Sequence, residues 1–267
     1  MILLPGAANF DRVWDLLGPL RDALGAPRRL IHLPPDQTAV FVGDTHGDCE
    51  ATHRVLQEFF NEEHVLVFLG DYVDRGPDSQ GNLELLFRAK IERPQGIHLL
   101  MGNHEAWAVA PFQPADFWEE VRPQEEEALT RTLALLPLAA HHPAGVLALH
   151  GALPDVESLQ DIERIALGSA NWRKITWGDW LDGPGYSHGE LLGRPTLGRD
   201  FFEEVAGRLG VRVLVRSHQP QAPLYLYGDQ VLTLFTTRAY GPGPRRVALL
   251  PQGKRVRTAR DLQLLEF

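Results

Sequence analysis

Three short apolar segments in the first half of the chain each end in a glycine that is followed at once by acidic, amide or imidazole side chains. The segments are residues 39–42, 65–69 and 97–101, with helical patterns near 49–60 and 79–91 between them. Alternation of this kind predicts buried parallel strands in an α/β core. The loops that follow these strands read Gly43-Asp44-Thr45-His46-Gly47-Asp48, Gly70-Asp71-Tyr72-Val73-Asp74-Arg75-Gly76 and Gly102-Asn103-His104-Glu105.

Two later strand-like runs end in the same way. His150-Gly151 follows residues 146–149, and Arg216-Ser217-His218 follows residues 211–215; further strand-like runs cover 231–235 and 247–250. A single aspartate after a strand is most often a helix cap. Ligand sites of such sheets lie at the carboxyl ends of the strands. Five polar clusters at five strand ends therefore predict one site on one rim of the core.

The donor types at these strand ends indicate which ligand the site would hold. Carboxylate, imidazole and amide groups without cysteine suit manganese, iron or zinc rather than a thiolate centre. Two carboxylates would leave two divalent ions with a surplus of about two positive charges, which favours a phosphate dianion and lowers the pKa of a bound water. Glycines beside these residues let the backbone turn and approach a ligand closely.

The three glycine-framed motifs resemble the signature of the phosphoprotein phosphatase family within the calcineurin-like metallophosphoesterases. The later clusters follow the order of that family, so the resemblance extends from about residue 39 to 250. It implies an α/β fold of the calcineurin-like metallophosphoesterase type, a sandwich of central mixed β-sheets flanked by helices. It also implies two divalent metal ions, with manganese preferred and iron or zinc as alternatives, and direct attack of a metal-bridging hydroxide on a phosphomonoester.

The resemblance also implies a role for each matching residue. Asp44, His46 and Asp71 would bind the first metal, and Asp71 would bridge to the second, whose other ligands would be Asn103, His150 and His218. His104 would be the general acid, oriented by Asp74. The substrate-binding residues would be Arg75, Arg194 (with Arg199 as the alternative) and Tyr240 in a loop overhanging the site. The family's cysteine after that tyrosine is Gly241 here, which makes recognition of toxin inhibitors doubtful.

Composition excludes several other classes. A net charge of −9 argues against a protein that grips nucleic acid through its phosphates. No apolar run approaches the ~18 residues of a membrane helix, and the start lacks the basic residues of a secretory signal. Cys49 is the single cysteine, so no internal disulfide can form. These features predict a cytoplasmic protein without a nucleic-acid or membrane partner. The resemblance implies that its partner is a phosphorylated protein or peptide; any regulatory subunit is left open.

The chain is expected to form an N-terminal helical extension, 1–38, packed on a catalytic domain, 39–267, with one domain overall. Residues 9–24 form the predicted helix, which places apolar side chains on one stripe: Phe10, Val13, Trp14, Leu17, Leu20 and Leu24. Asp48 and Glu50 are interpreted as capping or exposed residues, and His141-His142 as a surface turn. The segment 107–130 is either a cap beside the site or plain packing.

Three functions are compatible with these motifs. The first is a phosphatase that acts on phosphoserine and phosphothreonine; phosphotyrosine and phosphohistidine remain open. The second is a hydrolase of small phosphoesters or dinucleoside polyphosphates, which in its known form differs at the positions of Asp74 and Glu105. The third is a phosphoprotein-binding module without turnover, which would not need a general acid at His104.

Overall fold

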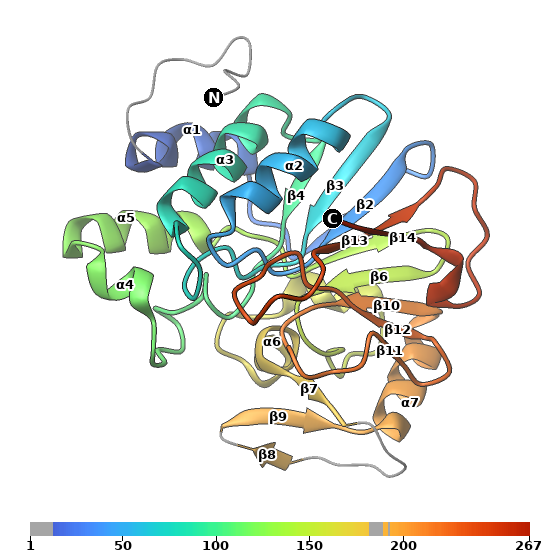
Figure 1. The fold of residues 1–267 in the computed structure, drawn as a ribbon. Helices are drawn as coiled ribbons and strands as arrows, with labels where there is room; N and C mark the ends of the chain where they lie inside the picture. Colours follow the sequence, from blue (N-terminus) through green and yellow to red (C-terminus); the bar gives the residue numbers. More distant parts are fainter. Residues whose placement is uncertain (1–12, 182–188, 192) are drawn as a thin grey trace.

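Two β-sheets face each other at the centre of the computed structural model, which describes residues 13–181, 189–191 and 193–267 (Figure 1). The first sheet has the strand order β1-β5-β6-β10-β12-β11 and the second the order β14-β13-β2-β3-β4. The strands of the first sheet are β1 (Leu30–His32), β5 (Ala139–His142), β6 (Val146–Leu149), β10 (Val213–Arg216), β11 (Tyr225–Leu226) and β12 (Val231–Thr233). Those of the second are β2 (Thr38–Val42), β3 (His64–Phe68), β4 (Ile97–Leu99), β13 (Arg246–Leu250) and β14 (Gln263–Glu266).

Side-chain alternation along the strands explains why two sheets form a sandwich. Phe41 of β2 and Val67 of β3 belong to a buried cluster that also holds Val146 of β6 and Val213 of β10. The neighbouring residues Val40 and Leu66 point the other way, into the cluster that includes the helices. Because successive side chains of a strand point to opposite faces, strands that are apolar throughout must be covered on both sides.

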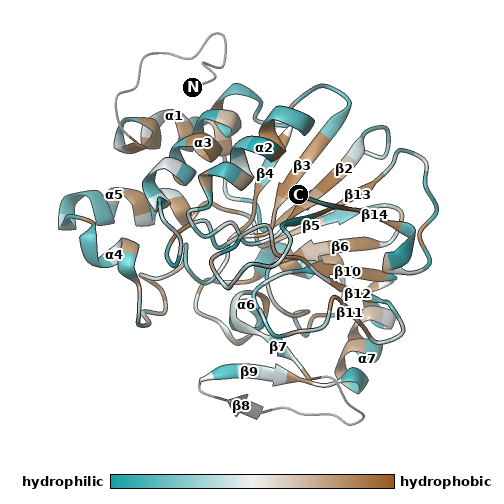
Figure 2. Ribbon diagram, in the orientation of Figure 1, coloured by the Kyte–Doolittle hydropathy of each residue, from teal (hydrophilic) through white to brown (hydrophobic). Residues whose placement is uncertain are grey.

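Helices cover the outer faces of the sandwich, with hydrophilic residues toward solvent and apolar residues inward (Figures 1 and 2). Both central sheets mix parallel and antiparallel pairs: β2, β3 and β4 run parallel, whereas β13 is antiparallel to β2. The helices are α1 (Leu17–Leu24), α2 (Cys49–Phe59), α3 (Ser79–Glu92), α4 (Asp116–Glu120), α5 (Pro123–Leu133), α6 (Ala170–Trp177) and α7 (Arg199–Leu209), with 3₁₀ turns η1 (Val13–Leu16), η2 (Leu159–Arg164) and η3 (Ala259–Asp261). The predicted fold class is confirmed.

The strands and helices predicted from residue 39 onward are present, but three features differ from expectation. His141-His142 is not a surface turn: it ends β5, which pairs antiparallel with β6, and His142 is buried. The polar sequence suggested a turn, yet the backbone hydrogen bonds to β6 hold the residues in a strand. The sequence also did not reveal β14 or the three-stranded sheet of β7 (Asp179–Trp180), β9 (Arg194–Leu197) and β8 (Gly189–Leu191).

The N-terminal region contributes more than a helix. Its predicted helix is present from Val13 as η1 and α1, while Phe10 lies outside the described residues. Gly25, at φ 68°, ends α1 in a conformation that favours glycine. Residues 30–32 then form β1, which pairs in parallel with β5 at the edge of the first sheet. Within the described part of the chain, no helix is long and apolar enough to cross a membrane.

Candidate metal centre

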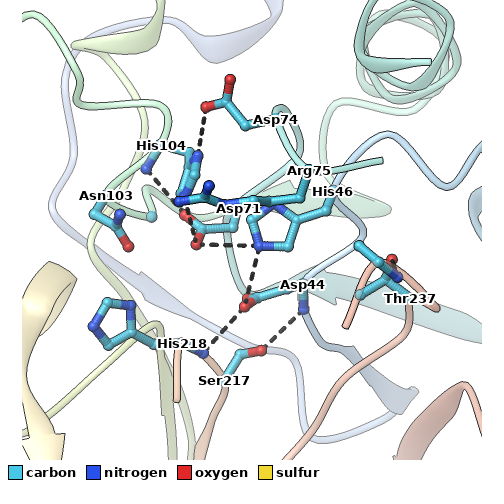
Figure 3. Close-up of polar contacts among 12 residues, drawn as sticks. Asp44, His46, Asp71, Asp74, Arg75, Asn103, His104, Ser217, His218 and Thr237 are labelled. Carbon is cyan, nitrogen blue, oxygen red and sulfur yellow. Dashed lines mark hydrogen bonds and ion pairs between the residues drawn. The ribbon is translucent and has the colours of Figure 1, made fainter. Parts of the chain in front are cut away.

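Side chains from the carboxyl ends of five strands meet at one rim of the sandwich, and Figure 3 shows Asp44, Asp71, Asn103 and His218 among them. Asp44 follows β2, Asp71 follows β3 and Asn103 follows β4, all in the second sheet. His150 and His218 follow β6 and β10 of the first sheet. Each of these side chains is buried. The structure thus brings together the residues whose convergence the sequence predicted, with each sheet supplying one side of the cluster.

Asp71 lies at the centre of this cluster. Its Oδ2 is 3.7 Å from Nε2 of His46, 3.8 Å from Nε2 of His104 and 3.3 Å from Nε2 of His150. Two groups of side chains could each hold a metal ion. The first consists of His46, Asp71 and His104, and the second consists of Asp71, His150 and His218. Within each group, all donor atoms lie within 4.8 Å of one another. Asp71 belongs to both groups, so one carboxylate is placed to serve two ions.

Backbone carbonyls orient two of the imidazole rings. Nδ1 of His46 is 2.8 Å from the carbonyl oxygen of Val73, and Nδ1 of His150 is 3.1 Å from that of Leu69. A carbonyl only accepts hydrogen bonds, so each Nδ1 carries a proton, and Nε2 is the nitrogen that offers a lone pair when the ring is neutral. Both Nε2 atoms face the cluster. This is the arrangement in which a neutral histidine binds a metal.

Several polar atoms of the cluster are placed to bind a cation rather than to form hydrogen bonds with one another. Oδ1 of Asp44 is buried and has no hydrogen-bond partner among the described residues, and Nδ1 of His150 lies 3.5 Å from it. Nε2 of His150 lies 3.1 Å from Oδ1 of Asn103 and 3.0 Å from Nδ1 of His218. Buried polar atoms are costly when unpaired, and a positive ion would satisfy an orphaned carboxylate oxygen and converging lone pairs at once. The donor set therefore fits hard or borderline divalent ions.

The protonation of the cluster is set by burial and by the close carboxylates. Burial lowers the pKa of His46 to about 3, so its ring is neutral at pH 7. Burial, opposed in part by the charge of His150, raises the pKa of Asp44 to about 7. Burial would lower the pKa of His150, but Asp71 and Asp44 raise it to about 9. Ligands must lose their protons to bind a metal, so metal binding here is coupled to proton release.

His104 and Asp74 form a buried pair beside this cluster (Figure 3). Nδ1 of His104 is 2.5 Å from Oδ2 of Asp74, while Nε2 of the same ring points toward Asp71. Burial opposes a charge on this ring, but Asp71 and the hydrogen-bonded Asp74 raise its pKa above the usual value. A histidine held in this way can carry a proton on Nε2 at neutral pH.

The predicted substrate-binding residues lie around the same opening. Arg75 is exposed, and its side chain interacts with the Tyr240 hydroxyl, which is 2.8 Å from Nε2 of His46. Arg194 contacts Nε2 of His218 and is held by Asp179 at 3.1 Å. The alternative, Arg199, instead lies over the ring of Tyr227, 5.6 Å from its centroid. Of the two candidates, Arg194 is the one at the cluster.

The model of the calcineurin-like phosphoesterase family matches residues 38–222, about seven tenths of the chain. This range includes the three glycine-framed motifs and both later clusters. The chain belongs to this family. The resemblance stated from the motifs is thereby confirmed. The buried His and Asp residues of the cluster all lie within the matched range, at or near the ends of its strands.

Several proteins to which this chain is similar in sequence or fold carry the names of phosphatases. A probable serine/threonine-protein phosphatase of Encephalitozoon cuniculi (strain GB-M1) is 29% identical over 233 residues, which are 80% of this chain and 50% of that protein. The chain thus spans about half the length of this relative. A protein serine/threonine phosphatase of Saccharomyces cerevisiae has a similar fold, with a TM-score of 0.79 and 20% identity over 96% of this chain and 88% of the other. A cold-active protein-tyrosine phosphatase of a Shewanella species has a TM-score of 0.59 and 18% identity, with coverages of 92% and 84%.

Glu105 is a member of the site whose role the sequence did not reveal. Its buried carboxylate accepts hydrogen bonds from the backbone N–H groups of Asp71, Tyr72 and Gly102, at 2.7, 2.8 and 3.0 Å. It thereby joins the second motif to the third. Asp71 itself has a φ of 53°, in the left-handed region that non-glycine residues rarely adopt. A Cβ on Gly102 would lie 2.2 Å from Oδ1 of Asp71, so this close approach requires glycine.

We expect Glu105→Ala to destabilise the protein strongly. The substitution leaves three buried N–H groups without an acceptor, and each such loss costs about 1–3 kcal/mol. The free energy of unfolding measured by urea titration should fall by about 3–9 kcal/mol. Glu58→Ala, on the exposed face of α2, is the matched control and should leave it nearly unchanged. A loss below about 1 kcal/mol for Glu105→Ala would show that these bonds do not hold the loops.

The loop that carries Tyr240 is attached to the first motif by an ion pair that the sequence also did not reveal. Arg245 donates to both carboxylate oxygens of Asp48, at 2.9 and 2.7 Å, and the Arg238 N–H donates to the same group at 3.1 Å. Asp48 also caps α2 by accepting from Ala51, as predicted, and Glu50 binds Arg245 from an exposed position. Asp48 therefore holds both ends of the loop that brings Tyr240 to His46.

Proposed function

We propose that this phosphoesterase is a protein phosphatase that hydrolyses phosphoserine and phosphothreonine monoesters at a dinuclear metal site. The observation that carries the proposal is the shared position of Asp71 between two sets of buried imidazoles, with the His104–Asp74 pair directly beside them. A dinuclear clamp next to an independent proton donor suits cleavage of a phosphate ester whose leaving group is a poor one.

The metal ligands in this proposal follow the two halves of the cluster. Asp44, His46 and Asp71 would hold one ion, and Asp71, Asn103, His150 and His218 would hold the other. When bound, the ions supply positive charge to the phosphate oxygens and lower the pKa of the attacking water. Manganese is the proposed native metal, with iron or zinc as the alternatives that the same oxygen and imidazole donors would bind. The cytoplasm is the proposed location.

The remaining residues would bind the phosphate and handle the proton. Arg75 is exposed at the rim and Arg194 lies at the cluster, so both guanidinium groups can contact the equatorial oxygens. Nε2 of His104 would donate its proton to the leaving oxygen, and Asp74 would balance the charge on the ring. His104 also lies close to the metal donors His46 and Asp71. This position is compatible with the acid role, because its Nδ1 is hydrogen-bonded to Asp74 and its Nε2 carries the proton to be donated. Tyr240, 45% exposed, would form a wall of the opening.

Three features favour a protein substrate over a dinucleoside polyphosphate. The second and third motifs end in Asp74 and Glu105, the form of the phosphoprotein phosphatases that the sequence resembles. The relative from E. cuniculi, which is longer than this chain, carries the name of a serine/threonine-protein phosphatase. The sequence has no glycine-rich phosphate loop that would hold the further phosphates of a nucleotide. A binding module without turnover is disfavoured by the His104–Asp74 pair, which a binder does not need.

The decisive assay compares two substrates on the same manganese-loaded enzyme. We expect kcat/KM for a phosphoserine peptide to exceed that for diadenosine tetraphosphate by at least tenfold, a transition-state preference of about 1.4 kcal/mol. Phosphothreonine and phosphotyrosine peptides of the same sequence measure the preference among protein substrates. A tenfold preference for the diadenosine compound would instead support the polyphosphate hydrolase. Tight binding of phosphopeptide without any release of phosphate would support the binding module.

A further inference from the structure

The segment that follows the third motif folds back onto the His104–Asp74 pair. It contains α4 and α5 and an aromatic cluster in which Trp107 stacks on Trp118, with ring centroids 5.5 Å apart and planes inclined by 12°. Phe117 and Trp118 of α4 are buried. From sequence, this segment could be a cap beside the site or plain packing. Its contacts show a more specific relation to the site.

One contact fixes the carboxylate of Asp74. Its Oδ2 is used by His104, and its Oδ1 accepts a hydrogen bond from the backbone N–H of Phe117 at 2.7 Å. Asp74 is fully buried, so without this donor the second oxygen would lack a partner there. Two bonds on opposite oxygens prevent the carboxylate from rotating away from the imidazole.

A second contact fixes the backbone of His104. The indole Nε1–H of Trp118 donates to the His104 carbonyl at 2.9 Å, and this bond is buried. On the other side, the ring of Phe112 packs edge-on against the His104 imidazole, with centroids 4.6 Å apart. Trp107 donates to the Phe112 carbonyl at 3.1 Å, so the same aromatic cluster places both contacts.

A third contact holds the strained turn of the second motif that is formed by Asp74 and Arg75. Asp74 and Arg75 both have left-handed φ values, 66° and 69°, which cost energy for non-glycine residues. The Arg75 N–H donates to Oδ1 of Asp116 at 3.2 Å, and the Asp74 N–H donates to Oγ of Ser79 at 2.9 Å. Three successive residues, 116–118, therefore contact Arg75, Asp74 and His104 in turn.

We propose that α4 is the positioning element of the general acid, with Trp118 as its principal positioning residue. This inference rests on the proposed function, because it assigns Trp118 an effect only through the proton donated by His104. Phe117 holds Asp74 and Trp118 holds His104, so one turn of helix sets the distance between the two members of the pair. Loss of the indole N–H lets the His104 loop relax, and small displacements of a catalytic group reduce its effectiveness strongly.

The test is Trp118→Phe, which keeps an aromatic ring against Trp107 and removes the N–H donor. We expect kcat for a phosphoserine peptide to fall about tenfold, while kcat for p-nitrophenyl phosphate falls less than about twofold, because nitrophenolate leaves with little protonation. Trp14→Phe, on the N-terminal helix of the same core, is the matched control and should change neither rate. Equal losses on both substrates would mean that Trp118 only stabilises the fold.

A double-mutant cycle with His104→Asn separates this inference from the function on which it rests. If Trp118 acts through His104, adding Trp118→Phe to His104→Asn should cause no further loss on the phosphoserine peptide. Additive losses would overturn the inference, whereas a His104→Asn variant with unchanged leaving-group dependence would overturn the acid role itself. Phe112→Leu, at a half-buried position, provides a second variant should Trp118→Phe fold poorly, with the same selective loss expected. Unchanged selectivity in Phe112→Leu would count against the positioning role.

Discussion

Exhaustive chelation is expected to reduce phosphoester hydrolysis to the background rate, and added Mn²⁺ is expected to restore it best. Ligands for the two proposed ions come from five strand ends in two sheets, and Asp71 belongs to both groups, so removal of the ions should disable the whole site. Among the residues that the structure describes, Oδ1 of Asp44 has no hydrogen-bond partner, so this buried oxygen can serve as a ligand to a cation. The measurement is phosphate release before and after chelation, with metal content determined on the same samples.

Chelation should also lower the thermal stability of the protein. A ligand that binds only the folded state stabilises it by about 2.7 kcal/mol at a concentration a hundred times its Kd. Asp71→Asn is the matched variant, because it keeps the shape of the side chain and removes the charge shared by both groups of donors. It should bind less metal and show a smaller shift in Tm on chelation. Full activity of metal-free enzyme, verified by metal analysis, would refute the proposed centre.

His104→Asn is expected to lower kcat for a phosphoserine peptide by about 10²–10⁴ while substrate binding changes little. The reason is that a general acid acts mainly in the transition state, when the leaving alkoxide takes up the proton. For p-nitrophenyl phosphate the loss should be much smaller. Steady-state kinetics on both substrates, with metal content matched between variants, measures the difference.

Asp74→Asn provides the graded comparison for this result. The amide can still bond to Nδ1 of His104, but it no longer balances a charge on the ring, so its defect should be a milder form of the same selectivity. In the wild type, Oδ1 of Asp74 accepts a hydrogen bond from the Phe117 N–H. If the asparagine places its oxygen toward His104, its NH₂ group takes the position of Oδ1 and cannot accept this bond. Equal losses of His104→Asn on both substrates, or loss of bound metal in that variant, would identify His104 as a metal ligand instead of the acid.

The strand-end motifs were predictable because the relevant information is local. Each apolar run specifies a buried strand, and the polar residue next to it must then lie at the strand end. The shared rim follows from topology, since parallel strands of one core present their carboxyl ends together. For the second phosphate-binding arginine, the sequence indicated only an order of preference, with Arg194 ahead of Arg199. The position of Arg194 at His218 became definite only with β9, which pairs with β7 beside the cluster.

The supporting contacts of the site could not be predicted in this way. Asp48 meets Arg245 across 197 positions of sequence, and Phe117 meets Asp74 across 43. In neither pair does one residue belong to a sequence motif that predicts the other. Phe117 contributes a backbone N–H, which every residue except proline possesses. The left-handed turn at Asp74 and Arg75 is likewise unfavourable by local preference. The sequence by itself thus determined which groups reach the site, whereas only tertiary packing decided how they are held, because strained loops and buried carboxylates need partners that folding brings from distant segments.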